Sequence, residues 1–400
     1  MQVFLLLFLF VFAILTLWLP AYWPTTMFQV GIFALAAITV WRARRHPILF
    51  AWPLVPLTFA VLWGILQWST GHTAYGFVTR LSILKWTTFL CVWTIGVKFF
   101  RDEKAARWYR SAMIWFAFGV AVLATLQLYT SAGAVFWLFP TAYSDNVMGP
   151  FLSRNDFAAF IEVVLPIALY RAVLDDRDAT LYSAMAAAMY AAVIASTSRA
   201  GVVLATLEIL LVPLLAWFQR GASGRVVRTA VLKLAGLVAV LTLIAGPDAV
   251  WQRLTASDPF AIRRELTVSS WHMATEHALI GTGLGTWATV YPQYAIIDVG
   301  ARMNEAHNDW LQWAVEGGFP FGILMTTLFF WSLRPAFRSV WGIGVVMVFL
   351  HATFDYPFAR STLGSWPILI LAMLVYFKKE TAAASAKFAP AAAVSLSERN

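Results

Sequence analysis

The chain has 400 residues, of which 60% are hydrophobic, 16% aromatic and only 12% charged, and its mean hydropathy is +0.71. Soluble proteins carry about 25% charged residues, so this composition argues against a soluble enzyme, a disordered chain or a nucleic-acid-binding protein. It predicts a polytopic membrane protein, and the net charge of +9 must be interpreted from where the 29 basic residues lie. The single cysteine, Cys91, excludes an intramolecular disulfide and a cysteine-based zinc site.

Twelve apolar segments are long enough to cross a hydrocarbon core about 30 Å thick as helices. In chain order they are 2–19, 24–41, 48–68, 81–100, 111–130, 155–173, 180–198, 200–218, 229–246, 308–331, 339–356 and 361–377. We therefore expect an all-α polytopic membrane protein with about 12 transmembrane helices. The first segment lacks the basic start and the cleavage site of a signal peptide, so we interpret it as a retained helix.

Basic residues in the connections predict the orientation, because cytoplasmic loops are rich in Lys and Arg. Alternate connections, with their flanking residues, hold 20 of the 29 basic residues. The other nine lie on the opposite side and are Arg80, Lys85, Arg154, Arg199, Arg253, Arg263, Arg264, Arg302 and Arg360. This bias predicts that both termini are cytoplasmic, and an even number of spans agrees with it.

The spacing of the spans divides the chain into four regions. Residues 1–246 hold the first nine spans, and residues 308–379 hold the last three. Residues 247–307 between them form one large loop on the side opposite the termini, and its Trp and Tyr residues predict a folded cap. The Ala- and Ser-rich segment 380–400 is predicted to be a disordered cytoplasmic tail.

Polar residues gather where the cap enters the tenth span. Helix capping explains part of this pattern, with Asn304 or Asn308 as the N-cap and Asp309 stabilising the first turn. It does not explain His307, or Glu316 about two turns inside the span. An ionisable group inside a membrane segment is a functional candidate by default. His307 is therefore a candidate catalytic residue, whereas Glu316 either has a functional role or bonds to a neighbouring helix.

Arginines on the same side form a second set of candidates. Arg199 lies in a short Ser-Thr-Ser-Arg-Ala-Gly connection, where it either extends to lipid headgroups or binds a substrate. Arg263 and Arg264 lie in the cap. Because guanidinium groups bind phosphate oxygens through paired donors, three such arginines near one cleft would suit a pyrophosphate group.

The glycine-rich segment 281–286 lies between two helices that we expect in the cap, at 260–278 and 286–295. No strand precedes it, which argues against a dinucleotide site. We interpret it as a tight turn whose backbone amides are available to an anion. The nearby His272 and His277 do not have the spacing of a metalloprotease motif, so we expect no metal site.

Further polar residues are expected on the same side, at the ends of spans or just inside them. Capping or interface anchoring explains each one singly, but together they are candidates for the lining of a common cleft. They are Arg154, Asn155, Asn308, Asp309, Glu316, His351 and Asp355.

Four stretches of the chain together resemble the O-antigen ligase family of the polysaccharide ligase and polymerase superfamily. They are Ser153-Arg154-Asn155-Asp156-Phe157-Ala158, Thr197-Ser198-Arg199-Ala200, Arg263-Arg264-Glu265 followed by the run from Glu276 to Gly285, and His307-Asn308-Asp309-Trp310-Leu311-Gln312 with Glu316 and Gly318. Their order and positions carry the resemblance more than any single motif. The chain departs from the family pattern at Ala200, where Gly is usual, and at Ala278, where Pro is common.

The resemblance implies a metal-independent, inverting glycosyltransferase of the bacterial inner membrane, with a GT-C-like helical fold, a periplasmic active site and no cofactor. It implies an undecaprenyl-diphosphate-linked glycan as the donor. Arg199 and Arg263 would bind the diphosphate, with Arg264 as an alternative to Arg263. His307 would act as the base or position the acceptor hydroxyl.

The acceptor is left open by these residues. Lipid A–core would make the protein an O-antigen ligase of lipopolysaccharide biosynthesis, which we favour. A second lipid-linked glycan would make it an O-antigen or exopolysaccharide polymerase, and a protein side chain would make it an O-oligosaccharyltransferase. A flippase or transporter is an alternative from another class, because Glu162, Glu208 and Glu316 lie inside spans, although the one-sided polar cluster argues against it.

Overall fold

The computed structural model describes residues 2–43, 51–144, 147–174, 178–220, 261–297 and 302–376, with short pieces between 228 and 237. The described part of the chain is all-helical, with 77% of its residues in helices. Within the described ranges, β geometry is confined to isolated bridges at 135–139 and 148–151. The all-α expectation is thereby confirmed. The predicted tail at 380–400, Arg253 and most of the ninth span at 229–246 lie outside the described residues.

Helices occur at each of the first eight expected spans. They are α1 (Gln2–Leu15), α2 (Tyr22–Ala43), α3 (Leu54–Ser69), α4 (Gly76–Phe99), α5 (Glu103–Thr130), α6 (Arg154–Leu174), α7 (Ala179–Ser196) and α8 (Arg199–Arg220). After the cap, α13 (Asp309–Ser339), α14 (Ile343–His351) and α15 (Ser361–Met373) occupy the last three expected spans.

Among the described helices, 5 are long and apolar enough to cross a membrane, namely α2, α5, α7, α8 and α13. The first and third helices, and α15 with the 3-10 turn after it, are shorter apolar helices. The protein is therefore a multi-pass membrane protein of helical architecture. The total of twelve crossings and their orientation stay predictions.

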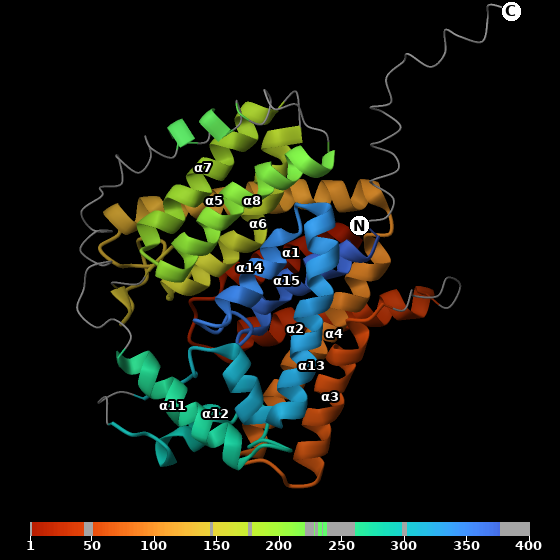
Figure 1. Ribbon diagram of the computed structural model, residues 1–400, viewed down its shortest axis with the longest axis vertical. Helices are drawn as coiled ribbons and strands as arrows, with labels where there is room; N and C mark the ends of the chain where they lie inside the picture. Colours follow the sequence, from red (N-terminus) through yellow and green to blue (C-terminus); the bar gives the residue numbers. More distant parts are fainter. Residues whose placement is uncertain are drawn as a thin grey trace, which may run out of the picture.

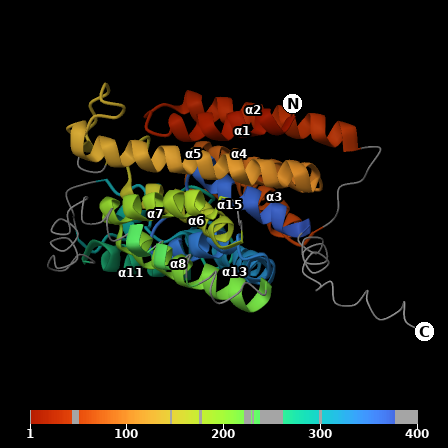
Figure 2. The same cartoon turned by 90° about the horizontal axis from the view of Figure 1, so that it is seen from above.

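The helices pack around α15, whose every residue is buried. It contacts α1, α4, α6 and α14, and a helix that is apolar on all sides requires such neighbours. Trp93 and Trp366 are among the large side chains that fill this core. Figure 2 shows α1 and α2 side by side on one face of the bundle, next to α4 and α5.

The tenth expected span, α13, contains a kink about two turns after its start. Gly318 has φ 75° and ψ 171° in the middle of the helix. A side chain there would be strained at that φ, and its Cβ would lie 2.5 Å from the carbonyl oxygen of Leu279. The kink lets the Phe319 amide donate to the Ala278 carbonyl at 2.8 Å, which docks the cap onto α13.

The cap folds as expected in its described part. It contains α11 (Ala261–Glu276), α12 (Trp287–Val290) and the 3-10 turn Tyr291–Gln293, so the second helix is shorter than predicted. The cap has its own small apolar core, in which Trp287 is fully buried and stacks on Tyr291 with ring centroids 4.6 Å apart. In Figure 1, α11 and α12 lie beside α13 and away from α5 and α7.

Candidate active site

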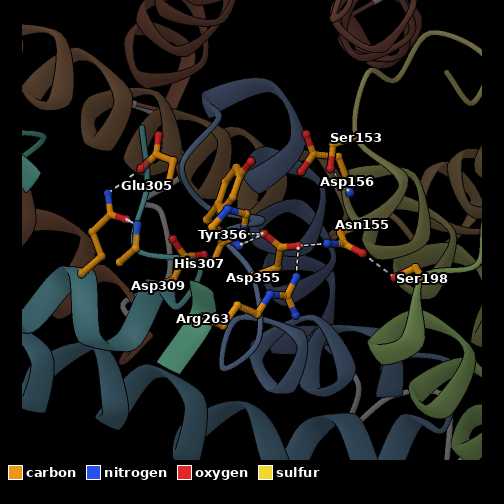
Figure 3. Close-up of polar contacts among 12 residues, drawn as sticks. Ser153, Asn155, Asp156, Ser198, Arg263, Glu305, His307, Asp309, Asp355 and Tyr356 are labelled. Atoms are coloured by element: carbon orange, nitrogen blue, oxygen red, sulfur yellow. Dashed lines mark hydrogen bonds and ion pairs between the residues drawn. The ribbon is translucent and has the colours of Figure 1, made fainter. Parts of the chain in front are cut away.

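The carboxylate of Asp355 contacts residues from three other parts of the chain and is linked through one of them to a fourth (Figure 3). Its Oδ1 atom lies 3.2 Å from His307 Nδ1, and its Oδ2 atom lies 3.6 Å from Arg263 Nη2 and accepts a hydrogen bond from Asn155 Nδ2. Asn155 in turn accepts a hydrogen bond from Ser198 Oγ at 2.7 Å. We call Asp355, His307, Arg263, Asn155 and Ser198 the polar cluster.

The residues of the polar cluster differ in solvent exposure. His307 and Arg263 are accessible to a bound molecule, whereas Asp355 is buried and contacts both of them. The side chains of His307 and Arg263 are 31% and 33% exposed, whereas that of Asp355 is only 4% exposed. The buried Asp355 carboxylate therefore orients an imidazole and a guanidinium that are each about one-third exposed. That arrangement suits a base and a cation that act on a bound molecule.

The pKa of Asp355 indicates that its carboxylate is ionised. Burial by itself would raise this pKa, but the hydrogen bond with His307 and the positive charges of His307, His351 and Arg263 outweigh burial and lower it. A buried carboxylate that stays charged holds a histidine in a fixed tautomer and stabilises its protonated form.

Backbone bonds place His307 beside Asp355. Asn308 is the N-cap of α13, and its Oδ1 accepts from the Leu311 amide at 3.0 Å, which confirms the capping interpretation for this residue. The Asp309 amide donates to the Ala352 and Asp355 carbonyls, at 2.8 and 3.2 Å. The start of α13 is thus tied to the loop that carries Asp355.

Asp309 is structural rather than exposed in a cleft. It is buried, and its Oδ2 accepts from the Phe358 amide at 2.9 Å, which fixes the loop between α14 and α15. His307 itself adopts φ 52°, a left-handed conformation that is rare for a residue with a side chain. Its ring packs edge-on against Tyr356, with ring centroids 4.8 Å apart. Strain of this kind persists where the surroundings impose it and is common at functional sites.

The structure distinguishes the two adjacent arginines of the cap. Arg263 points from α11 towards Asp355, whereas Arg264 is exposed. Consecutive helical residues point about 100° apart, so only one of the pair can face the polar cluster. This geometry favours Arg263 as the substrate-binding residue of the two.

Arg199 is the first residue of α8 and directly follows Ser198, a member of the polar cluster. The turn before it is held by a hydrogen bond of 2.7 Å from Arg154 Nη1 to Thr197 Oγ1, and Thr197 has φ 56°. Arg199 is partly exposed. It therefore starts from a backbone that is fixed to the polar cluster through Ser198 and Asn155.

Glu316 does not face a substrate but binds the glycine-rich turn. Its Oε2 accepts from the Gly285 amide at 2.7 Å and its Oε1 accepts from the Trp287 amide at 3.3 Å. The other amides from 282 to 284 donate to the carbonyls of Val315 and Glu316 and to Gln67 Oε1. We interpreted this turn as a source of free backbone amides for an anion, and that interpretation is wrong. These amides already donate hydrogen bonds to a carboxylate, to backbone carbonyls and to a glutamine side chain of the protein.

His351 also lies away from any cleft. Its side chain is buried inside the bundle, where Nδ1 lies 2.9 Å from Glu162 Oε1. It supports the site only indirectly, since its carbonyl accepts from the Asp355 amide at 3.0 Å. We expected His351 to line a cleft, and this expectation is wrong because its side chain is buried.

Two residues near the polar cluster were not singled out from the sequence. Tyr356 packs on His307, and Glu305 accepts from Gln312 Nε2 at 2.6 Å. Both are sequence neighbours of candidate residues, and adjacency was the only signal that pointed to them. In the described part of the chain, no group of three or more His, Cys, Asp or Glu residues has the arrangement of a metal site.

These features define a multi-pass helical membrane protein with a polar, partly exposed cluster that includes Arg263 of the folded cap. Residues 184–326 match the profile of a family described as O-Antigen ligase. The matched segment covers about a third of the chain and contains Arg199, Arg263 and His307, so this part of the chain is similar to a family of ligase- and polymerase-type glycosyltransferases. A search of curated proteins found no match.

Proposed function

We propose that the protein is an O-antigen ligase that moves a glycan from undecaprenyl diphosphate to lipid A–core in lipopolysaccharide biosynthesis. One observation carries the proposal: the buried Asp355 carboxylate contacts both His307 and Arg263, whose side chains are partly exposed. Both contacted residues lie within the matched segment. A base beside a cation, in a multi-pass membrane protein, suits transfer of a sugar from a lipid-linked diphosphate.

Asp355 selects the tautomer of the base. When Nδ1–H of His307 donates to Asp355 Oδ1, the Nε2 atom is left with its lone pair and accepts a proton from the acceptor hydroxyl. The ionised Asp355 then stabilises the imidazolium that forms. The deprotonating hydroxyl oxygen attacks C1 of the donor sugar as the bond between C1 and the diphosphate oxygen breaks.

The arginines act on the leaving group. Negative charge grows on the diphosphate as the C1–O bond breaks, and a guanidinium held in place stabilises that charge more than it stabilises the ground state. Arg263 is positioned by Asp355, and Arg199 extends from the start of α8. Attack from the face opposite the leaving group inverts the anomeric centre without a covalent intermediate, so no metal or cofactor is required.

The proposed reaction also implies on which side of the membrane the active site lies. Lipid-linked glycans of this kind would be joined on the periplasmic side of the inner membrane, with both termini in the cytoplasm. The charge bias of the loops supports this orientation, since Arg199, Arg263 and His307 all lie on the side depleted of basic residues.

The test is a reconstituted transfer reaction with full-length protein, an undecaprenyl-diphosphate-linked glycan and lipid A–core. Wild type is expected to give joined product, and Arg199→Ala, Arg263→Ala and His307→Ala are expected to abolish it while still inserting in the membrane. Near-normal transfer by all three variants would overturn the mechanism.

The same reaction separates the alternatives. Product formed only with a second lipid-linked glycan would identify a polymerase, and product formed only with an acceptor protein would identify an oligosaccharyltransferase. Movement of the lipid-linked glycan across the bilayer without any joined product would identify a flippase. In cells, deletion is expected to leave full-length glycan chains unattached to lipid A–core.

A further inference from the structure

A large cavity is lined in part by Glu305, which precedes the proposed base His307 by two residues. It has a volume of about 980 Å³ and is lined by the end of α1, the start of α2, the first half of α4, and the residues on either side of the polar cluster in sequence, 304–305 and 359–362. This volume is that of a site for a sizeable ligand. The mechanism proposed above uses none of the cavity's cations.

The cavity has an apolar wall and a polar end. Leu17, Leu19, Phe77 and Leu84 belong to the wall, and Tyr22, at 75% exposure, stands at its edge. Exposed apolar side chains on a membrane bundle face lipid. A molecule that entered from the bilayer would therefore meet an apolar surface first and the polar end afterwards.

Two cations stand at the polar end. Lys85 extends from α4, and within the described residues no carboxylate forms an ion pair with it. Arg360 lines the cavity, its side chain is 47% exposed, and it donates from Nε to Asp156 Oδ2 at 3.2 Å. Ammonium and guanidinium groups beside a lipid-facing wall are complementary to a phosphate group carried on a lipid.

Glu305 connects this cavity to the base. It lines the cavity and lies two residues before His307. Burial raises the pKa of Glu305, and the hydrogen bond from Gln312 together with the charges of Lys85 and Arg360 opposes that rise. The Glu305 carboxyl accepts a hydrogen bond from Gln312 Nε2, and within the described residues it forms no ion pair with Lys85.

Resting on the function proposed above, we propose that this cavity binds the second substrate, a glycolipid acceptor whose phosphate groups contact Lys85 and Arg360 while its acyl chains lie against α1, α2 and α4. The donor diphosphate then occupies the opposite side of His307, at Arg263 and Arg199. The donor lipid and the acceptor lipid then approach the His307 imidazole from opposite sides. A single transfer step requires that arrangement.

The experiment measures binding and transfer separately, with full-length protein in lipid nanodiscs. The probes are lipid A–core, the same lipid after removal of its phosphates, and undecaprenyl diphosphate. The variant is Lys85→Gln, and the matched control is Arg80→Gln, which removes one charge from the same helix at a residue that does not line the cavity. We expect Lys85→Gln to weaken binding of lipid A–core and raise its KM by about tenfold or more, with the donor KM unchanged.

The control and the dephosphorylated lipid are expected to behave differently. Arg80→Gln should change neither binding constant by more than about twofold, and the dephosphorylated lipid should bind wild type and Lys85→Gln equally. Equal effects of the two variants, unchanged binding in Lys85→Gln, or weaker binding of undecaprenyl diphosphate in place of lipid A–core would each overturn the inference. Failure of the proposed function has a different result, namely no joined product from wild type with either lipid.

Discussion

Asp355 Oδ1 lies 3.2 Å from His307 Nδ1, although 48 residues and two helices separate the two side chains in sequence. The contact forms because the start of α13 is hydrogen-bonded to the loop after α14, through the Asp309 amide. The same carboxylate holds Arg263 of the cap through its other oxygen. One buried acid therefore fixes the distance between the proposed base and a proposed diphosphate ligand, and this relationship governs the first three predictions.

His307→Asn is expected to lower glycan transfer by about 10²- to 10⁴-fold, the usual contribution of a general base. Asn tolerates the left-handed backbone of His307 better than Ala does, so the variant tests the imidazole and not the turn. Transfer in proteoliposomes is the measurement. His272→Asn, at an exposed histidine of the cap, is the control and should retain activity. Equal loss in both variants would contradict the assignment.

Arg263→Ala is expected to lower transfer by about 10²- to 10³-fold, because loss of one preorganised donor to a developing charge has that effect. Arg264→Ala should stay within about threefold of wild type, since Arg264 is exposed and α11 directs it away from Asp355. The two rates measured side by side check the choice between neighbours. A larger loss in Arg264→Ala would reverse it.

Asp355 is expected to make the free energy of unfolding depend on pH in the acidic range. Its pKa in the folded protein is lowered, so it lies below the unfolded value of about 3.9. The stability that this carboxylate contributes is therefore fully present above about pH 4 and is lost as the pH falls through the folded-state pKa. Thermal unfolding in detergent between pH 6 and 2.5 should show a loss in wild type that is shallower in Asp355→Asn. Identical pH profiles would show that Asp355 is not charged in the folded state.

Gly281→Ala is expected to destabilise the protein by about 1–3 kcal/mol. Gly281 has φ +78°, and a Cβ there would lie 2.3 Å from the Glu316 carbonyl oxygen, which belongs to the backbone and cannot move aside. Gly119→Ala is the matched control, because a Cβ at this position in α5 meets nothing within 4 Å. It should be neutral or stabilising by up to about 1 kcal/mol. Equal melting temperatures for the two variants would contradict the packing described for the turn.

Cysteine labelling in a Cys91→Ala background tests the orientation. His72 and Lys104 flank α4 and are both exposed. In spheroplasts with an intact inner membrane, the His72→Cys variant should react with a membrane-impermeant maleimide. The Lys104→Cys variant should react only after the membrane is permeabilised. The reverse pattern would place both termini outside.

Several parts of the site were predictable from sequence and others were not. His307 and Asn308 could be found because an ionisable residue and an N-cap at the start of an apolar helix are local signals. Glu316 was left between two roles, and its bonds to the Gly285 and Trp287 amides decide for the structural one. His351 was expected in a cleft, but packing against Glu162 buries it. Sequence spacing cannot show which of two helices will cover a side chain.

The sequence by itself determined the membrane class, the positions of the helices in the described residues and the residue types that gather on one side. These properties follow from hydropathy and charge summed along short windows, so they need no knowledge of contacts. Only the tertiary structure decided that Asp355 is the centre of the polar cluster, that Arg263 contacts it, and that Glu316 accepts hydrogen bonds from the glycine-rich turn. Those facts depend on contacts between distant residues, such as Asn155 and Asp355, 200 positions apart. They arise from how the helices pack, which no local pattern specifies.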